Sequence, residues 1–143
     1  MLFNPSQADV RRFFCGVWRK HSLGQLLQPL EAIALDWCLQ HPEYATDLAD
    51  EQTALAAQYP VDGGKSNPFL HLSMHLAIAE QLSIDQPPGI AQAYAQLARR
   101  LNGGHEAAHV LLDCLGEMLW RAQRDHQQPD TAAYLQCIER KAR

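Results

Sequence analysis

The chain has 143 residues, of which 47% are hydrophobic and 20% charged, and its formal net charge is -4 at pH 7. This length is enough for one domain with a hydrophobic core, and the composition is too apolar for a disordered chain. The negative charge argues against nucleic-acid binding, which needs a clustered basic surface. We therefore expect a globular protein without a nucleic-acid partner.

The first residues and the spacing of the cysteines predict in which cellular compartment the protein is found. The start of the chain has neither the basic segment nor the long apolar run of a signal peptide, and no apolar stretch has the length of a membrane span. The cysteines are widely spaced and form no Cys-x-x-Cys pair; they are Cys15, Cys38, Cys114 and Cys137. We therefore expect a cytoplasmic protein with reduced, mostly buried thiols and no membrane association.

Apolar residues recur at helical spacing along most of the chain, and capping residues, prolines and glycines separate the helical segments. In chain order, the first expected helices extend from residues 4–6 to about Lys20 and from Pro29 to about His41, and residues 43–57 are expected to form one or two short helices. The later expected helices cover residues 69–84, Ile90 to Leu101, His105 to about Arg124, and the chain from Pro129 onwards. No segment alternates as a strand would. The predicted fold is all-α, a compact bundle of about five to seven helices in a single helical domain over residues 1–143, with Trp18, Trp37 and Trp120 as core anchors.

Two His-x-x-x-His pairs are the most informative motif. His71 and His75 share one helix face with apolar residues, and His105 and His109 do the same on a second helix. Imidazole nitrogen binds zinc, iron, nickel and copper, so two facing pairs could supply four ligands, or three with one position open for water. We therefore predict a divalent transition metal, zinc or iron, at these four histidines.

Carboxylates near the second pair could complete such a site. Glu106 forms a Glu-x-x-His unit with His109, and Asp113 and Glu117 lie one and two turns further along the same helix. They are candidates to bind the metal or to orient an imidazole, and one of them could act as a base towards a metal-bound water. A full di-iron site is less well supported, because it needs a second Glu-x-x-His unit and two further glutamates.

The same histidines also fit a structural interpretation. The helix over 69–84 is apolar on almost every side, with a narrow polar strip at Ser73, Glu80 and Gln81. Such a helix must be buried on most sides, and a small bundle can achieve this by pairing with a second copy. The alternative is therefore a non-catalytic interaction module, a homodimer with buried, hydrogen-bonded histidines. His21, His41 and His126 are interpreted as helix-end or exposed residues.

Four segments resemble a known bacterial family. They are NPSQADVRRFF, PLEAIALD, NPFLHLSMHLAIAEQLSIDQPPGI and HEAAHVLLDCLGEMLW, and together they extend over nearly the whole chain. They are similar to the family of domain of unknown function 1841, found mainly in proteobacteria. The resemblance implies a small, stand-alone cytoplasmic protein and implies no activity, so the metal prediction depends on the histidine spacing alone.

Overall fold

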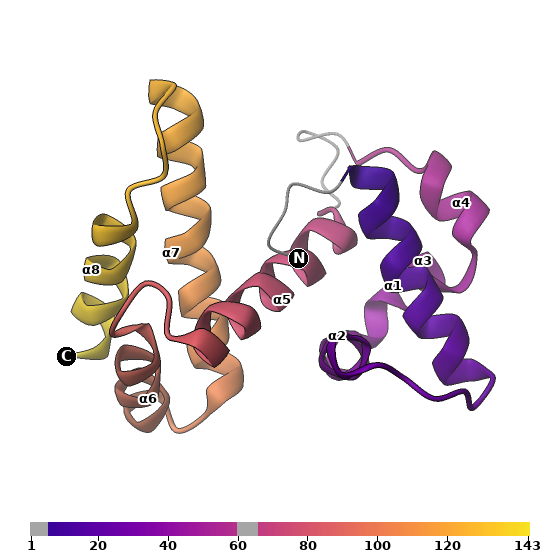
Figure 1. Cartoon of the computed structure of the whole chain (residues 1–143), viewed down its shortest axis with the longest axis horizontal. Helices are drawn as coiled ribbons and strands as arrows, with labels where there is room; N and C mark the ends of the chain where they lie inside the picture. Colours follow the sequence, from indigo (N-terminus) through magenta and orange to yellow (C-terminus); the bar gives the residue numbers. More distant parts are fainter. Residues whose placement is uncertain (1–5, 60–65) are drawn as a thin grey trace. The chain divides into compact units, whose positions relative to one another are not determined.

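The computed structural model describes residues 6–59 and 66–143, which contain α-helices, one short 3-10 helix and no strand (Figure 1). The all-α prediction is confirmed. The chain divides into two compact units, residues 1–77 and 78–143, and each is described by itself. The prediction of a single domain over residues 1–143 stays a prediction.

In its described residues, 6–59 and 66–77, the first unit contains four helices, a 3-10 turn and the first part of a fifth helix. These elements are α1 (Gln7–Ser22), α2 (Pro29–Leu39), η1 (Pro42–Tyr44), α3 (Ala45–Ala49), α4 (Glu51–Ala56) and α5 (Pro68–Ile84), which continues into the second unit. The stretch expected to form one or two short helices forms two, because Asp50 is extended and caps α4 by accepting from the N–H groups of Gln52 and Thr53.

The start of α1 follows the expected capping pattern. The Ser6 hydroxyl accepts a hydrogen bond from the Asp9 N–H at 3.1 Å, and the basic residues Arg19 and Lys20 lie in the last turn. Both features stabilise the helix, since they satisfy an N-terminal N–H group and complement the helix dipole. Residues 4 and 5 of the expected start lie outside the described residues.

The core of the first unit forms where α1 packs against α2, α3 and α4. Phe14 and Val17 of α1 are fully buried there, with Ala34 and Cys38 of α2. The beginning of α5 belongs to the same core, which also contains Phe69, Leu72 and Leu76. These three positions follow helical spacing. His71 and His75 each directly precede one of the buried leucines, so both lie close to this core.

The second unit contains the end of α5 and three helices, α6 (Ile90–Leu101), α7 (Gly104–Asp125) and α8 (Thr131–Ala142). The helices α6, α7 and α8 pack against one another (Figure 1). Buried residues from each of them form the core; they are Ile90, Ala93, Leu97, Ala107, Ala108, Leu111, Leu112, Leu115, Tyr134 and Ile138. The hydroxyl of Tyr134 donates to Gln81 Oε1 at 2.6 Å, which ties α8 to the end of α5.

The expectation of four reduced cysteines is wrong for two of them. Cys114 of α7 and Cys137 of α8 form a disulfide, whereas Cys15 and Cys38 are free and buried. Burial is the first cause that raises the pKa of Cys15 to about 11 and of Cys38 to about 12, so both are neutral thiols at pH 7. The bridge escaped sequence analysis because its two cysteines are 23 residues apart on separate helices.

Trp120 is not the core anchor that its size predicts. Its side chain is 57% exposed on α7, and the Arg124 guanidinium lies 4.7 Å from the centre of its ring. This arrangement is a surface cation–π contact, in which the indole keeps one face in water. No described helix is both long enough and apolar enough to cross a membrane.

Candidate metal centre

The C-terminal end of α2 positions the first histidine of the site. The last carbonyl groups of a helix need donors from outside it. Gln40 N–H donates to the Asp36 carbonyl, and His41 N–H donates to that of Cys38. The carbonyl of Trp37 instead accepts a hydrogen bond from a side chain, that of His41, whose Nδ1 lies at 2.8 Å. Nδ1 therefore has the proton of a neutral His41 ring, and Nε2 has the lone pair.

The N-terminal end of α5 positions the other two histidines. The Asn67 side chain accepts hydrogen bonds from the N–H groups of Phe69 and Leu70, at 3.0 and 3.2 Å, and Pro68 occupies the first helical position. This cap fixes where the helix begins. His71 and His75 then follow four residues apart on one face, and their ring centres are 4.6 Å apart.

The three imidazoles converge through their Nε2 atoms. His71 Nε2 lies 3.1 Å from His41 Nε2 and 3.1 Å from His75 Nε2. The candidate ligand atoms of these three residues all lie within 4.8 Å of one another. His41 and His75 are buried and His71 is partly buried, so the group lies at the edge of the first unit's core.

Two aromatic side chains hold the outer imidazoles in place. The Trp37 indole stacks on the His75 ring, with centres 3.8 Å apart and planes inclined by 13°. The Tyr44 ring is stacked with that of His41 at 5.1 Å and 5°. Burial is the main cause that raises the pKa of Tyr44, so its hydroxyl stays neutral at pH 7. Each stacked ring restricts the rotation of an imidazole and keeps its Nε2 directed at the group.

Hydrogen bonding alone does not satisfy both short contacts at once. An imidazole nitrogen has either a proton or a lone pair in the ring plane. His71 Nε2 therefore cannot donate a hydrogen bond to one neighbouring Nε2 and at the same time accept a hydrogen bond from the other. In a tetrahedral zinc site with Zn–N bonds of about 2.05 Å, neighbouring nitrogens lie about 3.3 Å apart. The observed spacing of 3.1 Å is close to that of nitrogens that share one metal ion.

The structure brings together only part of the predicted ligand set within one unit. His71 and His75 lie in the first unit, and the remaining candidates lie on α7 in the second; these are His105, Glu106, His109, Asp113 and Glu117. On α7, His109 Nδ1 donates to the His105 carbonyl at 3.0 Å, and Glu117 forms an ion pair with Arg121 at 2.6 Å. Their participation in a metal site stays a prediction.

His41 was not among the predicted metal ligands. Its interpretation as a helix-end residue is correct for its position, since it follows α2 directly, but the residue is buried rather than exposed. Pro42 is a local signal for the position of His41, because a proline disfavours the helical conformation of the residue before it and so places His41 just past the end of α2. The approach of this helix end to α5 is a tertiary contact that no local pattern contains.

Comparison with known proteins agrees with the resemblance of the four sequence segments. Residues 6–140 match the model of the family described as Domain of unknown function (DUF1841). The chain belongs to this family. The description of DUF1841 assigns no activity to its members, so a functional conclusion has to come from the site itself. No curated protein and no solved structure matches the chain.

Proposed function

We propose that this DUF1841 protein binds a divalent transition-metal ion through Nε2 of His41, His71 and His75. The observation that supports this is the convergence of the three Nε2 atoms at successive separations of 3.1 Å. The hydrogen bond from His41 Nδ1 to the Trp37 carbonyl adds to it. Metal-binding histidines characteristically donate their second ring nitrogen to a carbonyl or carboxylate, which directs the lone pair of the first.

The chemistry of the donors restricts the metal. The three proposed ligands are nitrogen donors, which suit zinc, iron, nickel and copper, whereas magnesium and calcium prefer oxygen. Zinc or iron agrees with this donor set. In a tetrahedral site the fourth position would be taken either by the predicted ligand His109 or by water, and only the second case resembles a catalytic rather than a structural zinc site.

If no second-unit residue fills the fourth position, the charge of such a site favours an anion there. Three neutral imidazoles do not offset the charge of a divalent ion, and this ion would lie beside the buried rings of His41 and His75. An anionic fourth ligand lowers the cost of burying that charge. A metal ion held by His41, His71 and His75 would supply Lewis-acid chemistry to a water or a small anion beside it. The proposed centre is therefore suited to a small anionic ligand.

Metal content of the untagged protein tests the proposal. The chain is purified without chelators and its metal is measured by plasma mass spectrometry, before and after a challenge with zinc or ferrous ion. We expect about one equivalent per chain in the wild type and a loss of most of it in His71→Ala and in His75→Ala. Circular dichroism shows whether each variant keeps its helices.

Two further variants make the result specific. His21→Ala removes an exposed histidine of α1 outside the cluster and should leave the metal content unchanged. The double variant His105→Ala/His109→Ala tests the predicted contribution of the second pair. A wild-type protein that stays empty when challenged would overturn the proposal, as would cluster variants that retain full metal content.

A further inference from the structure

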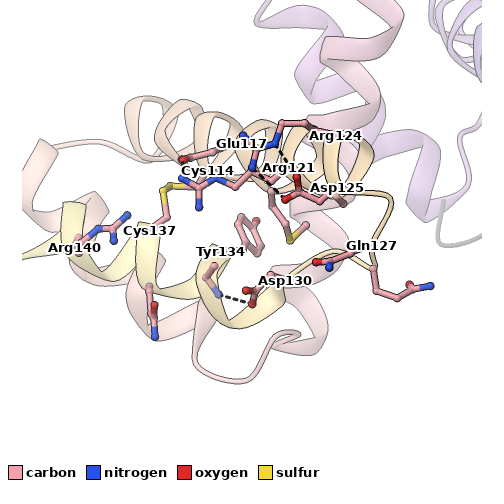
Figure 2. A pocket seen from close by; sticks show the side chains of 15 residues that line it. Cys114, Glu117, Arg121, Arg124, Asp125, Gln127, Asp130, Tyr134, Cys137 and Arg140 are labelled. Atoms are coloured by element: carbon pink, nitrogen blue, oxygen red, sulfur yellow. Dashed lines mark hydrogen bonds and ion pairs between the residues drawn. A yellow bond between two sulfur atoms is a disulfide. The ribbon is translucent and has the colours of Figure 1, made fainter.

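A pocket in the second unit lies between α7 and α8 and has a volume of about 340 Å³ (Figure 2). Its lining includes both cysteines of the disulfide together with Tyr134 and Arg140. Pockets of this size accept small organic molecules. All of its lining residues belong to the second unit, so this pocket shares no residue with the proposed metal centre.

The disulfide forms part of the pocket wall. Cys114 and Cys137 both line the cavity, and Figure 2 shows their bridge next to Arg140. Cys137 is 6% exposed and Cys114 is 1% exposed, so Cys137 is the more exposed of the two residues. A disulfide that lines a cavity can be reached by a small thiol, whereas one enclosed in a core cannot.

The charged residues of the pocket leave one cation available. Glu117 pairs with Arg121 at 2.6 Å, and Asp125 pairs with Arg124 at 2.9 Å. Arg140 lies three residues after Cys137 on α8 and forms no ion pair with any described residue. Its guanidinium can therefore bind a carboxylate of a molecule that approaches the bridge.

We propose that the pocket between α7 and α8 is a thiol-exchange site at which a small, carboxylate-bearing thiol reacts with the Cys114–Cys137 disulfide. Arg140 binds the carboxylate of the thiol and holds its sulfur near Cys137.

The exchange proceeds in two balanced steps. The thiolate attacks Cys137 Sγ, a mixed disulfide forms, and Cys114 Sγ leaves with the electron pair and takes up a proton from water. A second thiolate attacks the sulfur of the bound thiol, which releases the small-molecule disulfide and the Cys137 thiolate. In total, two thiols are oxidised to one disulfide, and the protein bridge is reduced to two thiols.

The rate of exchange with two thiols tests this site. Metal-free protein is incubated without oxygen with glutathione, which has carboxylates, or with 2-mercaptoethanol, which is neutral. Samples are quenched by alkylation and analysed by intact mass. We expect Arg140→Gln to slow the reaction with glutathione by roughly fivefold to tenfold and to leave the reaction with 2-mercaptoethanol unchanged. Arg99→Gln, an exposed arginine of α6 outside the pocket, is the matched control.

Reaction in the folded state has a second signature. Exchange within a formed pocket is insensitive to low concentrations of urea, whereas exchange through global unfolding accelerates with urea. Four alkylatable thiols in the protein as isolated without reductant would contradict the proposal. So would a rate that follows urea-induced unfolding, or an Arg140→Gln variant that reacts more slowly with both thiols alike.

Discussion

Arg11 is a buried cation that serves a helix end. Its side chain is 7% exposed, and its guanidinium donates to the carbonyl groups of Ala54 and Ala57, each at 2.7 Å. These carbonyls are at the C-terminal end of α4, where the helix dipole is negative and partners are missing. The rings of Tyr59 and Phe69 lie 5.4 and 5.6 Å from the same guanidinium. One side chain therefore joins α1, α4 and α5.

Replacing Arg11 should lower stability far more than replacing the arginine next to it. Arg11→Met keeps an apolar stem but removes both donors from the buried carbonyls, so we expect a loss of about 2–3 kcal/mol in the free energy of unfolding. Arg12→Met breaks only an exposed contact with Asp9 at 3.5 Å and should cost less than about 0.5 kcal/mol. Urea denaturation measures both values, and equal losses would contradict this assignment.

Among single residues, the histidines show what a sequence can and cannot predict. The pair His71 and His75 is predictable because residues four apart share a helix face. His41 is not, since it reaches the pair through packing between residues 30 positions apart. The stacking of Trp37 on His75 has the same origin. Local spacing thus predicts two of the three proposed ligands, and tertiary contact supplies the third.

The start of α6 depends on one carboxylate. Asp85 has a positive φ of 51° and accepts hydrogen bonds from the N–H groups of Ala91 at 3.0 Å and Gly89 at 3.2 Å. These hydrogen bonds, the one from Ala91 first, lower the pKa of Asp85 below its ordinary value. The ionised side chain therefore caps a helix that has a left-handed glycine, Gly89, at its N-cap.

Removing the charge of Asp85 should change how stability depends on pH. The pKa is lower in the folded state, so this contribution is present above the unfolded pKa and is lost as the pH falls through the folded pKa. Asn tolerates the positive φ and keeps an acceptor. We expect Asp85→Asn to melt below the wild type at pH 7, and we expect the difference to shrink as the pH falls below the ordinary pKa of an aspartate.

Melting temperatures at several pH values measure this difference. Asp36→Asn, which changes an exposed carboxylate of α2, is the control for a general effect of charge. A constant difference between the wild type and Asp85→Asn at all pH values would show that the charge has no part in the cap.

The helices themselves are largely predictable from local signals. Ser6 and Asp130 begin α1 and α8 with the expected caps, each accepting from an N–H group three residues later. The pairing of helices is not local. The disulfide requires α7 and α8 to be neighbours, and the exposure of Trp120 depends on which face of α7 is left uncovered.

Across the whole molecule, each of the two units has its own core, and the disulfide lies entirely in the second. A cross-link that closes a loop of this length stabilises by about 3 kcal/mol. We expect Cys137→Ser to reduce amide hydrogen-exchange protection in α7 and α8 and to leave α1 and α2 unaffected. Exchange followed by mass spectrometry resolves these segments.

Loss of protection in all helices alike would contradict this expectation. It would favour the single cooperative domain that the sequence predicts. The homodimer stays a prediction, and light scattering at micromolar protein concentration tests it.

The tryptophans divide between the two units, with Trp18 and Trp37 in the first and exposed Trp120 in the second. Because the Trp37 indole is stacked 3.8 Å from the His75 ring, a paramagnetic ion held by that imidazole would quench its fluorescence. Metal binding could therefore be followed by tryptophan fluorescence without a label, and Trp37→Phe would remove this signal.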